Sequence, residues 1–383
     1  MAFEFATAGR IVFGEGASSQ AAPAAAAMGR RVLLVTGSAS RAPALARELE
    51  AAGLTVVPFR VSGEPAIDTV AAGTALARGE NCDVVIASGG GSAIDAGKAL
   101  AAMLTNPGEP LDYLEVVGRG QPLRQPSAPF IAIPTTAGTG SEVTRNAVLA
   151  APERGVKASL RSPHLLPRLA VVDPQLTLDL PPALTASTGL DALTQLIEPY
   201  VSVRANAMTD LYTVEGLRMA ADALPRAWAN GGDEEARRGM CWASLLGGLS
   251  LANAGLGAVH GFASPVGGMF LAPHGAVCAA LLAPAMAINL EALRRRAPEN
   301  RALSRYDEVA RLLTGRPHAE AADGIEWVAA LCRRFGIPPL GAYGVKAADI
   351  PVLAARAAEA SSMKGNPIQL TREELEEIIG RAI

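Results

Sequence analysis

The chain has 383 residues, of which 50% are hydrophobic and 19% are charged, with a formal net charge of −3. This composition is typical of a soluble globular protein with a large core, and at roughly 150 residues per domain the length predicts two or three domains. The basic residues are scattered rather than gathered in one stripe, which argues against a nucleic-acid partner.

The cysteines and the apolar runs indicate the compartment. Cys82, Cys241, Cys278 and Cys332 stand far apart and form no CxxC pair, so we interpret them as reduced thiols of the core in a reducing compartment. No terminal segment has the pattern of a signal peptide, and no apolar run reaches the length of about 20 residues that spans a bilayer. We therefore expect a cytoplasmic protein with no membrane partner.

The first 181 residues alternate short β-rich runs with longer helical runs. The β-rich runs are short and dense in Val, Ile and Leu, as buried parallel strands are. They predict strands at residues 31–36, 55–61, 83–88, 130–134 and 169–173. Helices are predicted between the early strands, at residues 41–52, 69–78 and 93–104. This alternation predicts a doubly wound α/β domain over residues 1–181.

The character of the sequence changes at Pro181-Pro182, which cannot continue a preceding element. Beyond this pair Ala and Leu recur at helical spacing, and strand-like alternation is almost missing. We predict an all-helical second domain over residues 182–383. In such a protein, ligands are expected outside the carboxyl ends of the strands, in the crevice between the two domains.

A glycine turn joins one predicted strand to the next predicted helix. Gly89, Gly90, Gly91 and Ser92 follow the apolar run at 84–88 and precede a good helical sequence. Glycine lets a ligand approach the main chain, and the helix N-terminus offers free N–H groups and a positive dipole end, which suits a pyrophosphate. The turn matches neither GxGxxG nor a Walker loop, so a tight turn without a ligand is the alternative interpretation.

A second loop, residues 135–142, follows the strand predicted at 130–134 and contains four hydroxyl side chains and two glycines. These groups suit the ribose and phosphates of a cofactor, although an ordinary hydroxyl-rich loop is the alternative. Two such loops after neighbouring strands predict a dinucleotide site.

The four histidines divide into two kinds. His164 and His318 each follow a proline near polar residues, and we expect both at the surface. His260 lies in an apolar helical run and His274 between Pro and Gly, where satisfied core residues are the alternative. With Asp191, at the start of an apolar helix, they would form a set of two imidazoles and one carboxylate, which suits Fe(II) or Zn(II) with open positions for substrate.

These motifs together resemble the iron-containing alcohol dehydrogenases, a group structurally close to glycerol dehydrogenase and dehydroquinate synthase. The resemblance covers nearly the whole chain and is carried by segments 9–17, 89–95, 134–144, 171–174, 189–193 and 273–275. It implies a Rossmann-like α/β N-terminal domain followed by an all-α domain, a dehydroquinate synthase-like fold, with cofactor and metal in the cleft between them. It also implies a homodimer or a larger homo-oligomer.

The resemblance assigns cofactor contacts residue by residue. The glycine turn, Gly89 to Ser92, with Asp95 would hold the pyrophosphate and the nicotinamide side, and the second loop would line the cofactor through Thr135, Thr136 and Thr139, with Lys157 nearby.

Relatives that prefer NAD often carry an Asp at the position of Gly37, whose charge would repel a 2′-phosphate. Here Ser38, Ser40 and Arg41 follow instead and could receive that phosphate. We hypothesise that NADP(H) is accepted as well as NAD(H).

The metal ligands of the family are Asp, His four residues later, and two further His. Asp191, His260 and His274 match three of them, but Gln195 stands at the second position. Its amide oxygen lies one helical turn after Asp191 and is a weaker ligand than imidazole. A second departure is Ser264, where the family usually has a His beside the substrate that is a plausible proton carrier.

The resemblance thus implies hydride transfer between NAD(P)(H) and a small alcohol, aldehyde or ketone. Fe(II) or Zn(II) on Asp191, Gln195, His260 and His274 would polarise the substrate oxygen, while the cofactor supplies the redox chemistry. Asp191, His260 and His274 are the predicted catalytic residues. Two alternatives remain: a metal-independent oxoacid reductase resembling maleylacetate reductases, and a nucleotide-binding relative whose catalysis is weakened by Gln195 and Ser264.

Overall fold

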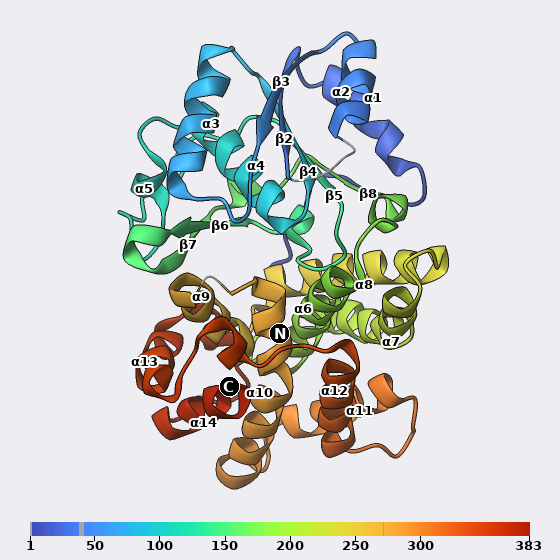
Figure 1. The fold of residues 1–383 in the computed structure, drawn as a ribbon, viewed down its shortest axis with the longest axis vertical. Coiled ribbons are helices and arrows are strands. Elements are labelled where there is room, and N and C mark those ends of the chain that lie inside the picture. The colour runs from blue at the N-terminus through green and yellow to red at the C-terminus, as the bar shows by residue number, and fades with distance from the viewer. Residues whose placement is uncertain (1, 38–41, 271) are drawn as a thin grey trace. The chain divides into compact units, whose positions relative to one another are not determined.

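The computed structural model describes residues 2–37, 42–270 and 272–383. Ser38, Ser40 and Arg41 therefore lie outside the described residues. The chain divides into two compact units: an α/β unit of residues 6–136 and 140–178, and a helical unit of residues 2–5, 137–139 and 179–383. Each is described by itself below, with the element labels of Figure 1.

The α/β unit is built on a six-stranded sheet in the order β1-β8-β5-β4-β2-β3, with every neighbouring pair parallel. The strands are β1 (Ile11–Phe13), β2 (Arg31–Thr36), β3 (Thr55–Arg60), β4 (Val84–Gly89), β5 (Phe130–Pro134) and β8 (Leu169–Val172). The predicted parallel α/β arrangement is thus confirmed. The short edge strand β1 was not predicted, because its three residues give too little pattern to distinguish a strand from a loop.

Two apolar layers cover the sheet, since successive strand residues point to opposite faces. Leu33 and Val35 pack with residues of α3 and α4, whereas Val32 and Leu34 pack with residues of α1 and α2. The helices are α1 (Ala21–Ala26), α2 (Ala42–Ala51), α3 (Ile67–Gly79), α4 (Gly91–Thr105) and the short α5 (Pro110–Tyr113). The three-layer packing fixes where each strand ends and hence where its following loop begins.

A separate antiparallel hairpin was missed by the sequence analysis. It consists of β6 (Asn146–Ala151) and β7 (Val156–Arg161), which pair along their whole length. Its turn contains Gly155 at φ +58°, a left-handed conformation that glycine adopts without steric penalty. Alternate residues of β6 are buried, so the period of two was present, but in a run of small Ala residues it carries little signal.

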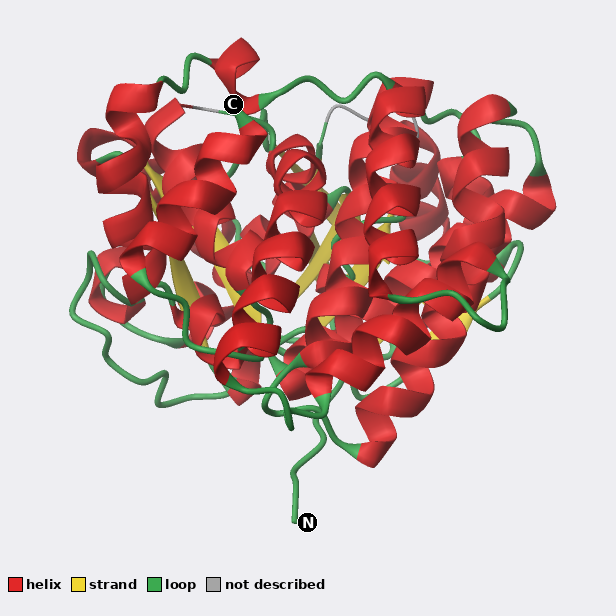
Figure 2. Cartoon of the chain, turned by 90° about the horizontal axis from the view of Figure 1, so that it is seen from below, coloured by secondary structure: helices red, strands yellow, loops and turns green. Residues whose placement is uncertain are grey.

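The helical unit runs from α6 to α14, and its described part contains no strand after residue 178 (Figure 2). Pro181 is the N-cap of α6 and Pro182 its first residue, a position where the missing N–H of proline is harmless. The helices are α6 (Pro182–Val201), α7 (Ala207–Ala229), α8 (Glu234–Ala254), α9 (Ala258–Phe270), α10 (His274–Arg296), α11 (Ala302–Thr314), α12 (Ala321–Phe335), α13 (Ile350–Glu359) and α14 (Arg372–Ala382). The predicted all-α character of this part is confirmed.

The helix α10 corrects one expectation. By length and composition it is apolar enough to cross a membrane, contrary to the prediction that no segment reaches that length. However, 72% of its apolar window is buried inside the fold. A helix that is apolar nearly all round is the ordinary centre of a large helical core, and α10 has that place here.

Candidate active site

Three predicted cofactor segments meet at the carboxyl edge of the parallel sheet. In the strand register Thr36 lies beside Ser88, and Gly89 lies beside Pro134. The chain therefore leaves β2, β4 and β5 at the same edge. The amide of Thr135 donates to the carbonyl of Gly89 (2.9 Å), which joins the second loop to the glycine turn.

This edge is also the topological switch point of the sheet. From β2 the chain moves outward to β3, whereas from β4 it moves the other way to β5, and ligands of open α/β sheets bind where the order reverses. Gly37 follows β2 at this point, and Gly90 is the N-cap of α4, where no described side chain caps the helix. A Cβ at Gly90 would lie 3.4 Å from the Thr136 side chain, so the turn and the second loop lie side by side.

Asp95 and Lys98 join this turn to the rest of the α/β unit. Asp95 accepts hydrogen bonds from the Ser141 hydroxyl (2.5 Å) and the Val148 amide (3.0 Å). Lys98 is fully buried and donates to the Ser141 and Thr144 hydroxyls (2.8 and 2.7 Å) and to a carbonyl of β6. These contacts hold the second loop and the hairpin against α4, so the structure gives Asp95, predicted to contact cofactor, internal partners.

Burial shifts the ionisation of this polar group. Loss of water lowers the pKa of Lys98 to about 8, although Asp95 and Glu142 oppose the shift. It raises the pKa of Glu142 to about 7, against the effects of its own backbone hydrogen bond and of Lys98. Both groups therefore favour their neutral forms more than they would in water.

The two remaining predicted cofactor residues lie elsewhere. Lys157 is on β7, where its ammonium pairs with Glu64 (2.5 Å). Thr139 belongs with the helical unit rather than with Thr135 and Thr136. The structure thus brings Gly37, the glycine turn, Thr135 and Thr136 together, and gives Lys157 a carboxylate partner of its own.

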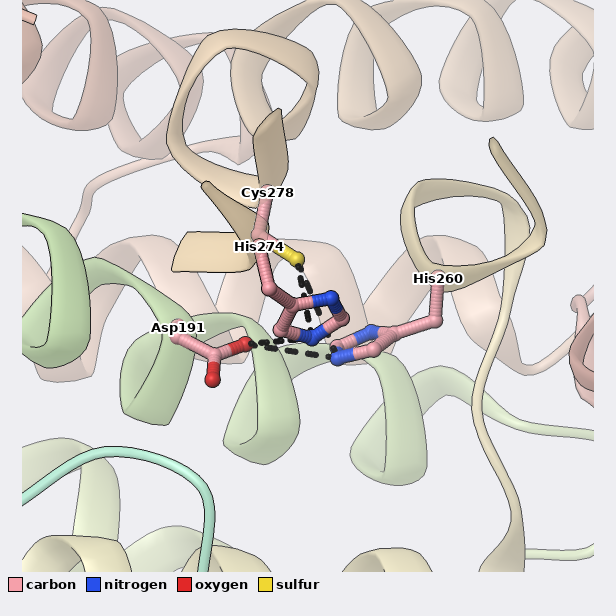
Figure 3. A group of neighbouring side chains, drawn as sticks. All are labelled: Asp191, His260, His274 and Cys278. Carbon is pink, nitrogen blue, oxygen red and sulfur yellow. Dashed lines mark hydrogen bonds and ion pairs between the residues drawn. The ribbon is translucent and has the colours of Figure 1, made fainter. Parts of the chain in front are cut away.

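A second group of predicted residues converges within the helical unit (Figure 3). Asp191 comes from α6, His260 from α9 and His274 from the first turn of α10. Asp191 Oδ1 lies 3.4 Å from His260 Nε2 and 3.6 Å from His274 Nε2. Asp191 is 1% exposed and the His274 side chain 38%, so the group is reachable from the His274 side.

Two close contacts set this arrangement. Gly275 lets α10 approach α6, because a Cβ there would lie 2.5 Å from the carbonyl oxygen of Ser187. The buried Glu198, two turns after Asp191 on α6, accepts from His260 Nδ1 (2.7 Å) and from the Val259 amide (2.7 Å). With Nδ1 held by this carboxylate, Nε2 is the ring nitrogen that faces Asp191.

One member of this group, Cys278, was not predicted from the sequence, whereas Gln195 was predicted as a ligand. Cys278, fully buried one turn after His274 on α10, places its Sγ 3.7 Å from His274 Nε2 and 3.9 Å from His260 Nε2. The i, i+4 spacing of His274 and Cys278 was a usable signal, since residues so spaced share one helix face, but we interpreted the thiol as core packing. Gln195 is 2% exposed and its Oε1 finds no hydrogen-bond partner among the described residues.

The ionisable side chains of this group shift one another's pKa. Burial alone would lower the pKa of both imidazoles, but Cys278 and Asp191 raise it, to about 9 for His274 and well above the usual value for His260. Burial would raise the pKa of Asp191, but His274 and His260 hold it below its usual value. The group therefore keeps Asp191 ionised opposite two imidazoles that retain their protons, and a metal ion would bind there with release of those protons.

The donors fit a divalent transition metal. Four side chains each contribute one donor atom, and these four atoms lie within 4.8 Å of one another. The residues are Asp191, His260, His274 and Cys278. Asp191 Oδ1 has no hydrogen-bond partner among the residues described and only the two longer ion pairs with the imidazoles, and a bound divalent cation would satisfy this buried oxygen more fully. Imidazole, carboxylate and sulfur donors suit Zn(II) or Fe(II) rather than Mg(II) or Ca(II).

The remaining histidines are exposed, as predicted: His164 lies just before β8 and His318 between α11 and α12. Ser264, where the family usually has a His, is half-buried on α9, one turn after His260.

The geometry defines a nucleotide-binding α/β unit combined with a helical unit that carries a candidate metal centre. The sequence model of the family described as iron-containing alcohol dehydrogenase matches residues 8–174, and the model of the C-terminal part of the same family matches residues 185–383. The chain therefore belongs to the iron-containing alcohol dehydrogenase family, and it is an oxidoreductase acting on alcohols.

Individual relatives match over most of their length. Alcohol dehydrogenase 4 of Saccharomyces cerevisiae (strain YJM789) is 37% identical over 359 residues, which are 92% of this chain and 91% of that protein. The NAD-dependent methanol dehydrogenase of Bacillus methanolicus is 35% identical over 366 residues, 92% of each chain. A crystal structure of a 1,3-propanediol oxidoreductase superposes with a TM-score of 0.92 at 33% identity and covers 100% of both chains.

Proposed function

We propose that this protein transfers a hydride between NAD(P)(H) and a small alcohol or the corresponding aldehyde or ketone, with a divalent metal, Fe(II) or Zn(II), held by Asp191, His260 and His274. The observation that carries the proposal is the convergence of two imidazole Nε2 atoms on a buried carboxylate oxygen without a hydrogen-bond partner among the residues described. A divalent ion held there supplies Lewis-acid polarisation of the substrate oxygen.

Several side chains of this protein would support the proposed reaction through their charge and orientation. Asp191 stays ionised and contributes negative charge, and Glu198 holds His260 in the tautomer that presents Nε2. The partial exposure of His274 supports an approach for a small substrate from that side. Because Ser264 is a poor proton carrier at neutral pH, we propose that water or the ribose hydroxyls of the cofactor relay the proton.

The cofactor proposal rests on the switch point of the sheet. Gly37, the turn from Gly89 to Ser92, and Thr135 with Thr136 offer backbone and hydroxyl groups to a dinucleotide at one edge. The Bacillus methanolicus relative is NAD-dependent by name, which supports NAD(H). Since Gly37 carries no acid to repel a 2′-phosphate, we propose that NADP(H) is accepted too, and a preference of tenfold or more for NAD(H) in kcat/KM would contradict this.

The alternative of a metal-independent oxoacid reductase is tested by chelation. Activity that survives removal of the metal from the purified protein would favour this alternative over the metal-assisted reaction. We also propose a cytoplasmic protein, supported by four cysteines that form no disulfide. On the family resemblance we propose a homodimer or larger assembly, which light scattering during size-exclusion chromatography measures.

The test is turnover of the purified, metal-loaded protein on a panel of short alcohols and aldehydes with either cofactor. Asp191→Asn keeps the shape of the side chain but removes its charge, so we expect kcat to fall by at least about 100-fold, together with the metal content. His318→Ala, which removes an exposed histidine of the same unit, is the matched control and should keep both. Cofactor binding without turnover on any member of the panel would instead support a nucleotide-binding relative that has lost catalysis.

A further inference from the structure

Cys278 is the one member of the converging group that neither the sequence motifs nor the proposed function uses. Its side chain is fully buried, and Figure 3 shows its sulfur directed at the two imidazoles rather than away from them. We propose that Cys278 Sγ is the fourth protein ligand of the metal, in the place for which the family pattern offers Gln195. This inference rests on the proposed metal site and deepens it.

The distances are close to the edges of a tetrahedron of donors. Bonds of about 2.0–2.3 Å to oxygen, nitrogen and sulfur in a tetrahedral site place neighbouring donor atoms about 3.3–3.8 Å apart. The two distances from Asp191 Oδ1, 3.4 and 3.6 Å, lie within this range, and the two from Cys278 Sγ, 3.7 and 3.9 Å, lie at and just beyond its upper end. An octahedral set with bonds of about 2.1 Å would bring adjacent donors to roughly 3 Å.

Independent of the thiol, Asp191 directs an oxygen at the same point as the imidazoles. Its Oδ1 is buried and without a hydrogen-bond partner among the described residues, and it faces both imidazoles. His260 in turn is held by Glu198 through Nδ1, so its free nitrogen points the same way. Sγ of Cys278 thus completes a set of donors that is already aimed at one position.

The charges also favour sulfur over the amide of Gln195. Asp191 alone would leave one uncompensated positive charge on a divalent ion in a buried site, which is costly. When the ion binds, the Cys278 thiol releases its proton to solvent and the S–H bond is replaced by a metal–sulfur bond. The thiolate and the carboxylate together then balance the ion, whereas the neutral Gln195 cannot.

A thiolate ligand changes which metal ion the site binds more tightly. Sulfur is a softer donor than imidazole or an amide oxygen, and it favours Zn(II) over Fe(II) more strongly than the ligands it replaces. We therefore expect the full-length protein to bind Zn(II) at least tenfold more tightly than its Cys278→Ser variant in competition with a chromophoric chelator.

The experiment uses the full-length protein, stripped of metal and loaded with Co(II). Thiolate coordination gives an intense sulfur-to-cobalt charge-transfer absorption in the near ultraviolet, which imidazole and carboxylate ligands do not give. We expect this band in the wild type and in Gln195→Ala, and its loss in Cys278→Ser and Cys278→Ala. Cys241→Ser, which alters another buried cysteine of the same unit that forms no disulfide, is the matched control and should keep the band.

Each result bears on a different claim. Cobalt d–d bands without the charge-transfer band in the wild type, or a band that persists in Cys278→Ser, would show that the metal is bound without Cys278 and would overturn this inference alone. Failure of the wild type to bind Co(II) at all would overturn the proposed metal site as well. Should the variants not fold, X-ray absorption of the Zn(II)-loaded wild type decides, since the inference requires one sulfur at about 2.3 Å.

Discussion

Glu198 determines which nitrogen of His260 faces Asp191. Its two carboxylate oxygens accept from His260 Nδ1 and from the Val259 amide at the start of α9. The negative charge also lies at the positive end of the α9 dipole. One side chain of α6 thus sets both the tautomer of an expected ligand and the position of the helix that carries it.

Replacing Glu198 by Gln removes this charge with little change of shape. The amide cannot hold the Nδ1 proton of His260 as a carboxylate does, so we expect metal affinity and kcat each to fall by about 10–100-fold. KM for the cofactor should stay within about twofold, because that site lies on other residues. Metal content by mass spectrometry and steady-state kinetics check this, and unchanged metal affinity would contradict a positioning role.

At the scale of elements, the sequence predicts the strands better than the loops. The predicted ranges of β2 and β5 coincide with the observed bounds, because dense Val, Ile and Leu runs between turns have few other stable conformations. The Ala-rich hairpin β6–β7 was missed because its residues fit helix and strand about equally. Its position on the unit depends on contacts that are distant in the chain, such as Lys98 with the carbonyl of Asn146.

The residues of the candidate site also divide into those that local sequence predicts and those that depend on distant contacts. Asp191, His260, His274 and the glycine turn could be predicted, because motifs fix which residues occupy those positions. The hydrogen bond of Glu198 could not be predicted, because its partner lies on another helix. The spacing of Cys278 from His274 was readable, but the approach of its thiol to His260 on α9 was not. Whether a buried polar side chain packs or binds depends on what faces it, and a single sequence does not contain that information.

The turn between β4 and α4 yields a prediction at this scale. A valine at Gly90 would place methyl groups where the pyrophosphate is expected over the bare main chain. We expect Gly90→Val to weaken binding of NAD(H) and NADP(H) at least tenfold, measured by quenching of nicotinamide fluorescence. Bound metal should remain, because Asp191 and its partners lie in the other unit.

Gly79→Val is the matched control for this substitution. Gly79 is the last residue of α3, and a Cβ there meets no atom within 4 Å. Cofactor binding that survives in Gly90→Val as it does in Gly79→Val would place the pyrophosphate elsewhere.

At the scale of the whole molecule, the buried carboxyl group of Glu142 predicts that the stability of the protein depends on pH. The pKa of Glu142 is raised from 4.5 to about 7, so between these values the unfolded chain has lost a proton that the folded chain retains. The free energy of unfolding should therefore decrease as the pH rises from about 4.5 to 7, by on the order of 1–3 kcal/mol. Below this window Glu142 is protonated in both states and contributes no slope.

Glu142→Gln should flatten this part of the profile, since the amide does not titrate. Glu153→Gln, at an exposed position in the turn between β6 and β7, should keep the wild-type slope. Urea unfolding at half-unit pH steps, followed by circular dichroism, measures all three proteins. Equal slopes for the wild type and Glu142→Gln would refute the assignment.

The burial of Lys98 has a practical use. Its ammonium is fully enclosed, whereas Lys346 and Lys364 lie on the surface. An amine-acylating reagent should therefore label those two lysines within the native protein and reach Lys98 only after the α/β unit opens. Peptide mass spectrometry of acylated Lys98 would then report, from one side chain, how often this half of the molecule unfolds and how far a bound dinucleotide suppresses that opening.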